Sequence, residues 1–271
     1  MLFLDGRNWA AGRSCEKVRC VETYQKTLPF KPGGKVRVET RNGEIRVRGW
    51  EKDEVKIEAT KEAKAYTKEK AARRLKETKI KIERKDSEID ISTETAPDCT
   101  VNYEIFVPQR TDLSARNMNG WLGFSKLRGQ LTAKLTNGWV NLCEILGTVN
   151  LEVTSGWVSI DKVSGTLNLE MTSGYVELEQ TTGEISLRVV SGYIRGEISP
   201  EASRVALSTE TGDIELSVPE DAEPVIYVKK GGTVRSDFPI FTTQECFKQA
   251  KAKPKIEVET TTGNIRIRKA K

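Results

Sequence analysis

Apolar and polar residues alternate along most of the chain. In the central part, short segments place an apolar residue at every second position, as in Leu131, Ala133 and Leu135, and each segment ends close to a glycine. This alternation is typical of a strand that buries one of its two faces. The pattern therefore predicts a succession of short strands separated by sharp corners.

The segments recur with a fixed period. A glycine stands at every ninth position from 120 to 192. Alternate glycines have different neighbours, so the repeating unit is two glycine spacings, or 18 residues, long. Apolar residues such as Val140, Val158 and Val176 recur with the same period. Copies with a constant period stack with equivalent positions about 4.8 Å apart. We therefore predict an all-β fold, a parallel β-solenoid (β-helix), with two corners in each coil of about 18 residues.

A column of small polar residues precedes one glycine of each unit. The column consists of Asn119, Asn137, Ser155, Ser173 and Ser191. Glycine suits a corner because it adopts a positive φ at little cost, and small polar side chains can bond the backbone groups of a bend. We expect these residues to have a structural role.

Two segments interrupt the repeat. Copies of the repeat motif recur at 41–47, 209–216 and 261–267, which frame an insert at about 59–95 and a second insert at about 218–254. The first insert contains an Ala-, Lys- and Glu-rich stretch that predicts one helix at about 61–78, followed by a hairpin at about 80–91. Because the ends of a stack expose unpaired backbone, we expect the inserts to cover them. The predicted organisation is an N-terminal extension, 1–27, and a single β-solenoid domain, 28–271.

Charge and composition exclude several kinds of function. The chain has 44 basic and 39 acidic residues, but residues 113–216 contain only eight basic against twelve acidic ones. The net negative middle argues against a nucleic-acid partner. The sequence has no histidine, which removes histidine-based catalysis and histidine-ligated zinc. No apolar run is long enough to span a membrane, and polar residues interrupt residues 1–12, so we expect neither a membrane span nor a signal peptide.

Five cysteines are scattered along the chain without the spacing of a metal site. Cys15 and Cys20 are close enough in sequence for a small disulfide loop, and unpaired thiols are the alternative. Cys143 has no histidine that could activate it as a nucleophile. Glu152 and Glu170 fall in one outward column with Lys134 and Arg188, a pattern typical of a solvated sheet face. We therefore predict no catalytic, cofactor-binding or metal-binding residues and no enzymatic activity.

An aromatic residue follows one corner glycine in each unit. These residues form a column of five, which we call the aromatic stripe: Trp121, Trp139, Trp157, Tyr175 and Tyr193. Because Val140 and Leu142 are predicted to point inward, the preceding ring points outward or lies at the corner. Four rises of about 4.8 Å give a stripe about 19 Å long. It is a candidate binding surface for another protein or a glycan; alternatively, the rings stabilise the sheet by stacking on one another, or lie beneath the helix or the C-terminal insert.

Several short motifs occur in a characteristic order. Phe-Lys-Pro-Gly-Gly stands at 30–34, Asn-Gly-Glu-Ile at 42–45, Ser-Asp-Phe-Pro at 236–239 and Thr-Gly-Asn-Ile at 262–265. In this order the chain resembles the bacterial putative adhesin family, a group of repeat β-solenoid domains of unknown function, over residues 28–268. The resemblance implies a cell-envelope or extracellular setting and supplies no catalytic residues. Two features depart from the family: members usually begin with an export signal or anchor, and they commonly have Asp or Asn where this chain has the aromatic stripe.

We therefore expect a non-enzymatic structural or interaction module, an adhesin-like protein of the bacterial cell envelope. One alternative is a cytoplasmic β-helix scaffold that polymerises end to end. The other is a glycan-binding or polysaccharide-active β-helix protein. The sequence leaves the compartment, the oligomeric state and the partner open.

Overall fold

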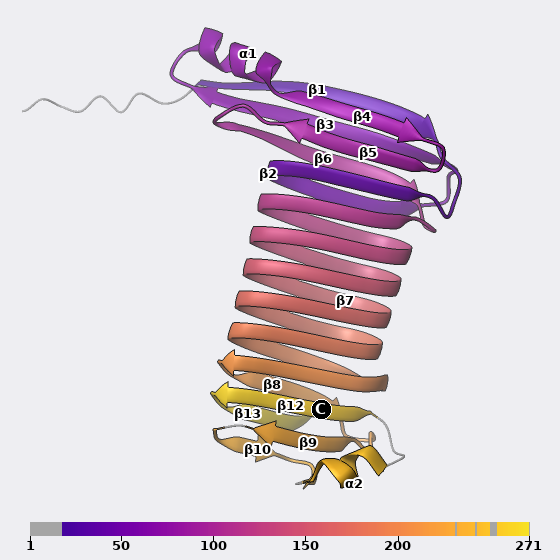
Figure 1. Ribbon diagram of the computed structural model, residues 1–271, viewed down its shortest axis with the longest axis vertical. Helices are drawn as coiled ribbons and strands as arrows, with labels where there is room; N and C mark the ends of the chain where they lie inside the picture. The colour runs from indigo at the N-terminus through magenta and orange to yellow at the C-terminus, as the bar shows by residue number, and fades with distance from the viewer. Residues whose placement is uncertain (1–17, 231, 242, 250–253, 271) are drawn as a thin grey trace, which may run out of the picture.

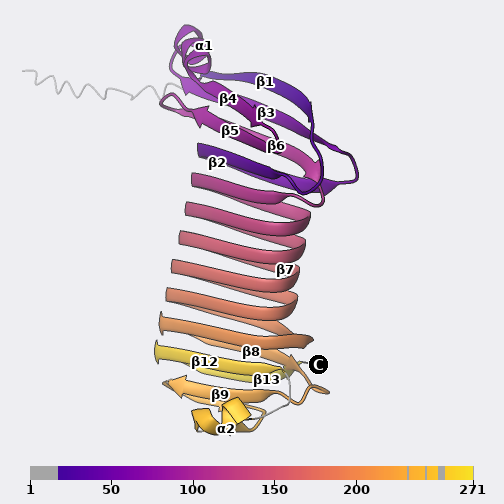
Figure 2. The same ribbon diagram turned by 45° about the vertical axis from the view of Figure 1, so that its right-hand side comes forward.

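The computed structural model describes residues 18–230, 232–241, 243–249 and 254–270. Within these ranges the protein is mainly β, with strands joined in one 13-stranded mixed sheet and two short helices at opposite ends of an elongated molecule (Figures 1 and 2). The stretch 1–12 and Cys15, one of the two cysteines of the disulfide that the sequence left open, lie outside the described residues.

The longest element is β7 (Asp112–Thr211), which winds through successive turns along the molecule (Figure 1). We call one such winding a coil. Glycines one repeat unit apart lie on top of one another: a Cβ added to Gly156 would come within 1.7 Å of the Gly138 carbonyl oxygen. All nine glycines predicted at corners have a positive φ. A side chain at these corners would thus collide with the neighbouring coil.

Each coil has a further unusual backbone position that the glycine pattern does not reveal. Lys126, Glu144, Lys162 and Gln180 have φ between 44° and 57°, although none of them is glycine. They too recur once per repeat unit, just before Leu127, Ile145, Val163 and Thr181, which are all buried. The left-handed conformation lets the chain bend while the next side chain still points inward.

The core consists of columns of buried apolar side chains. Val140, Val158 and Val176 are at most 2% exposed, so the predicted inward positions are buried. One column becomes polar near its ends, where Asn117, Thr209 and Thr260 are buried. The Asn117 amide donates to the Gly43 carbonyl oxygen at 2.8 Å, and both threonine hydroxyls donate to the Gly212 carbonyl oxygen. These hydrogen bonds offset the cost of burying polar groups.

At the N-terminal end, the strand that contains the early copy of the repeat motif, 41–47, pairs between strands that come later in the chain. β2 (Lys35–Trp50) pairs in parallel with the start of β7 on one side and with β5 (Glu88–Glu94) and β6 (Cys99–Pro108) on the other. β3 (Glu54–Ala65) then pairs antiparallel with β6 and with β1 (Val18–Pro29). The parallel pairing predicted for the solenoid therefore gives way to antiparallel pairing at this end. Residues 18–27, which we expected in an extension, belong to the sheet as part of β1.

The predicted helix is shorter than the sequence suggested. α1 spans Lys68–Glu77, and its N-cap Thr67 accepts a hydrogen bond from the Lys70 amide. Residues 61–65, expected in this helix, instead extend β3 between β1 and β6. Alanine and lysine favour a helix locally, but pairing with a strand on each side outweighs that preference. The hairpin that follows is confirmed as β4 (Lys79–Lys85) and β5, paired antiparallel.

The C-terminal insert contributes strands to the same sheet. β8 (Ile214–Pro219) continues β7, and the chain then forms β9 (Val225–Lys230), β10 (Val234–Ser236) and β11 (Ile240–Phe241). β12 (Lys255–Thr262) returns to pair between β7 and β9, and β13 (Ile265–Ala270) pairs between β8 and β10. The insert also contains a second helix, α2 (Gln244–Gln249), which the residue pattern did not predict.

Candidate functional site

The aromatic stripe lies on the outside of the coils, and its rings differ in exposure. Trp139 is 63% exposed and Trp157 is 45% exposed, whereas Trp121, Tyr175 and Tyr193 are half-buried. Neither of the two helices in the described ranges covers the stripe, since α1 packs on β1 and β3 and α2 packs on β9 and β11. The stripe is therefore not uniform, and its exposed aromatic surface is concentrated in two tryptophans.

The C-terminal half of the stripe is held by contacts within the protein. Tyr175 and Tyr193 stack with ring centroids 5.4 Å apart, and Trp157 meets Tyr175 edge to face at 5.0 Å. The Tyr193 hydroxyl donates to a Glu215 carboxylate oxygen at 2.5 Å. Burial, followed by this hydrogen bond, raises the pKa of Tyr193 to about 12. The same hydrogen bond holds the pKa of Glu215 below its usual value.

The N-terminal end of the stripe is covered by a cation. The Arg46 guanidinium lies 4.3 Å from the centroid of the Trp121 ring, a cation–π geometry. Among the described residues, no aromatic ring or cation makes such a contact with Trp139. The prediction that rings stack on one another thus describes Tyr175 and Tyr193, and Trp157 in part, but not Trp139.

Small polar residues flank the exposed tryptophans. Asn137 donates to the side-chain oxygen of Asn119 at 3.0 Å, and Asn119 donates in turn to that of Asn42 at 2.9 Å. These side-chain amides form a row of hydrogen bonds that runs toward the N-terminal end. The side-chain oxygen of Asn137 stands at the other end of the row and accepts none of these hydrogen bonds. On the other side of the rings, Asn141 and Ser159 follow the tryptophans by two positions. Each exposed tryptophan therefore has a short polar residue two positions before it and another two positions after it in the sequence.

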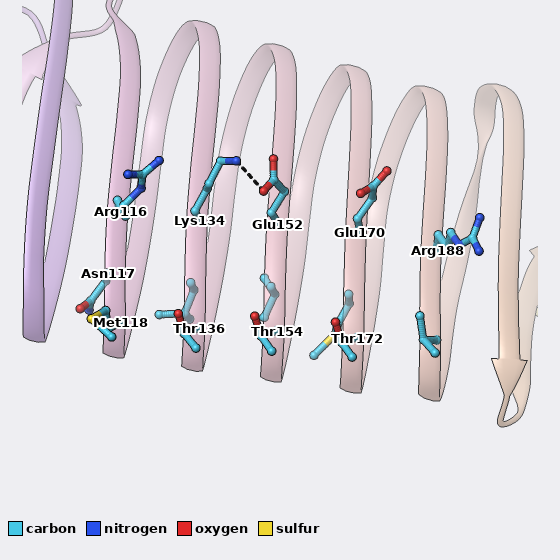
Figure 3. A pocket seen from close by; sticks show the side chains of 14 residues that line it. Arg116, Asn117, Met118, Lys134, Thr136, Glu152, Thr154, Glu170, Thr172 and Arg188 are labelled. Carbon is cyan, nitrogen blue, oxygen red and sulfur yellow. Dashed lines mark hydrogen bonds and ion pairs between the residues drawn. The ribbon is translucent and has the colours of Figure 1, made fainter.

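A shallow groove lies on the strand segments that precede the corner glycines of the aromatic stripe (Figure 3). Its volume is about 460 Å³. Figure 3 shows a row of charged side chains on successive coils above a row of threonines. The charged row consists of Arg116, Lys134, Glu152, Glu170 and Arg188. The Lys134 ammonium pairs with Glu152 at 2.5 Å, as the sequence pattern predicted for a solvated sheet face.

The surroundings of Cys143 do not favour a nucleophilic thiol. Burial, followed by the neighbouring Asp161 and Glu144 carboxylates, raises the pKa of the Cys143 thiol and disfavours its reactive thiolate. Within the described ranges, no three potential cysteine, aspartate or glutamate ligands cluster as a metal site would require. Neither helix seen there has the length and apolar character needed to cross a bilayer.

Comparison with known proteins identifies the family. The family model described as Toastrack DUF4097 matches residues 22–268. The chain belongs to this family. Membership in the Toastrack family confirms the resemblance that the ordered motifs predicted. No curated protein matches this toastrack chain.

Two solved structures are similar to this toastrack chain. One is described as a putative cell adhesion protein from Clostridium sporogenes, with 14% identity and a TM-score of 0.29 over 92% of this chain and 100% of that one. The other is described as a putative adhesin from Bacteroides fragilis, with 12% identity and a TM-score of 0.32 over 92% of this chain and 97% of that one. At these identities and TM-scores neither structure indicates what the present chain binds.

Proposed function

We propose that the protein is a non-enzymatic interaction module of the bacterial cell envelope, in which a β-solenoid rod presents the aromatic stripe to a partner. The observation that supports this function most directly is the exposure of Trp139 and Trp157 on adjacent coils. Leaving a large indole in water forgoes about 1.5–3 kcal/mol of burial free energy, which becomes available when a partner covers it.

The rod itself follows from the stacking of coils. Each coil contacts only the coils above and below it, so the molecule extends without enlarging its core. Interleaved strands at both ends tie early and late segments together, which resists fraying. Such a body holds surface side chains at fixed spacing and suits display of a linear binding surface.

Binding to isolated bacterial envelopes tests the proposal. Parent protein should sediment saturably with the envelopes, and the double variant Trp139→Ser/Trp157→Ser should lose about tenfold or more in affinity, since aromatic anchors carry much of the energy of an interface. Leu146→Ser is the matched control, because Leu146 is 50% exposed but lies beside Gly147 at the other corner. Circular dichroism and thermal unfolding report whether each variant is folded.

Two outcomes would contradict the function. Equal sedimentation of the parent and the double variant would show that the stripe does not bind. Unfolding of the double variant, with Leu146→Ser still folded, would show that the two tryptophans stabilise the sheet rather than contact a partner.

A further inference from the structure

The stripe continues into a polar cavity at its C-terminal end. The register places Asp213, Asn264 and Thr233 on the coils that follow Tyr193 in the same column. All three line a cavity of about 280 Å³ together with Tyr193. A ligand that extends along the stripe would therefore reach this cavity next.

Two arginines lie side by side in the cavity. Arg266 on β13 and Arg235 on β10 are register partners in parallel strands. The two arginines are the last members of a column of outward side chains on successive coils. Before them the charge alternates in sign from one coil to the next, through Glu177, Arg195 and Glu215. Like charges placed directly opposite each other on a sheet repel, and this cost is offset in part by Glu215, the register partner of Arg266 on its other side. An anion between the two guanidinium groups would remove that cost.

The carboxylates of the cavity are engaged by other groups. Asp213 accepts hydrogen bonds from the backbone and side-chain amides of Asn264, at 2.7 and 3.1 Å. Glu215 accepts from Tyr193 and forms an ion pair with Arg268 at 3.3 Å. Within the part of the chain that the structure describes, no carboxylate lies at ion-pair distance from Arg235 or Arg266. Alongside the Tyr193 hydrogen bond, the charge of Arg266 helps to lower the pKa of Glu215, but among the described residues neither guanidinium is held in an ion pair, so both can bind an external carboxylate, sulfate or phosphate group.

We propose that the ligand of the stripe is an acidic polysaccharide, with sugar rings stacked on Trp139 and Trp157 and an acidic group bound by Arg235 and Arg266. This assignment rests on the proposed function of the stripe. Four rises of about 4.8 Å separate the level of Trp157 from that of Arg266, about 19 Å in all. A polysaccharide spans this length while presenting flat ring faces at a regular repeat, which matches rings that recur once per coil.

The short polar groups beside the tryptophans fit the same ligand. Sugar hydroxyls need hydrogen-bond partners at the edge of a stacking platform, and Asn137, Asn141 and Ser159 provide amide and hydroxyl groups there. Sites for sugar rings, hydroxyl groups and an anion thus lie along one line of the molecule.

Titration calorimetry with polygalacturonate, alginate and heparin tests the assignment, with fully methyl-esterified polygalacturonate as the uncharged control. We expect the parent to bind at least one of the three acidic polymers, and binding to polygalacturonate to be lost on esterification. Arg235→Gln/Arg266→Gln should weaken acidic binding about tenfold or more, the usual effect of losing charge-assisted hydrogen bonds. Arg73→Gln/Arg84→Gln removes the same charge at the other end of the molecule and should leave affinity within about twofold.

The outcomes separate this assignment from the proposed function. Failure of all three polymers to bind, or full affinity in Arg235→Gln/Arg266→Gln, overturns the acidic-polysaccharide assignment even when Trp139→Ser/Trp157→Ser abolishes envelope sedimentation. Loss of sedimentation after protease treatment of the envelopes identifies a protein partner and overturns it too. Unchanged sedimentation of the tryptophan variant instead refutes the function of the stripe itself.

Discussion

At the corners of β7, backbone conformation and close approach act together on single residues. Gly156 has a φ of 146°, and a Cβ there would lie 1.7 Å from the Gly138 carbonyl oxygen. We expect Gly156→Ala to lower the free energy of unfolding by about 1–3 kcal/mol, because the strained φ and the collision both oppose the native coil. Urea denaturation measures the loss. Among the described residues the exposed Ser155 side chain makes no hydrogen bond, unlike Asn119 and Asn137 of the same column. Ser155→Ala should therefore change stability by less than about 0.5 kcal/mol, and an equal loss there would refute this explanation.

Tyr193 provides a residue-scale test of the stripe's electrostatics. Its phenolic pKa is raised to about 12, so the folded protein keeps the proton where an unfolded chain, with the ordinary value of 10.0, has lost it. The stabilisation from this group is complete below pH 10.0 and declines as the pH rises toward about 12. Phenolate absorbance of Tyr193, taken as the difference between parent and Tyr193→Phe, should appear near pH 12.

Glu215, which accepts the Tyr193 hydrogen bond, makes stability depend on pH in the opposite direction. Glu215 has a lowered pKa in the folded state, mainly because it accepts the Tyr193 hydrogen bond. Its contribution is present above the unfolded pKa and is lost as the pH falls through the folded value. In Tyr193→Phe the pKa of Glu215, followed by NMR, should rise toward its model-peptide range. An unchanged value would show that the hydrogen bond is not responsible.

Within an element, the inward and outward positions of a coil differ sharply in energetic importance. Leu142 is fully buried, whereas Leu146, on the same coil, is 50% exposed. Leu142→Ala should cost about 2–5 kcal/mol through lost burial and a cavity in the stacked core. Leu146→Ala should cost less than about 0.5 kcal/mol. Similar costs for the two variants, measured by denaturation, would contradict the burial pattern of β7.

At the scale of the whole molecule, the ends of the stack determine whether copies can join. α1 lies at one end and α2 at the other (Figures 1 and 2), and β1 places charged Arg19, Glu22 and Lys26 along the outermost strand. Covered and charged ends oppose edge-to-edge pairing. We expect electron microscopy of purified protein to show separate rods. Filaments would instead favour the polymerising scaffold that the sequence left open.

The sequence patterns were informative where interactions repeat locally. The repeat period marks the corner glycines, the buried columns and the aromatic stripe, because each coil presents the same positions to its neighbours. The helix at 61–78 was overextended, since residues 61–65 join β3 through strand partners that lie far away in the sequence. The left-handed positions at Lys126 and its equivalents carry no composition signal, because the residue types there are ordinary.

By itself the sequence determined the repeat, the inward columns and the set of five stripe residues, since these depend on alternation and period alone. Only the tertiary structure decided which rings are exposed, because Arg46 and Glu215 reach the stripe from segments outside its five members. It likewise decided that β2 and β12 pair between segments distant in the chain. The pairing of Arg235 with Arg266 follows from that interleaving, since only long-range strand register brings the two side chains together.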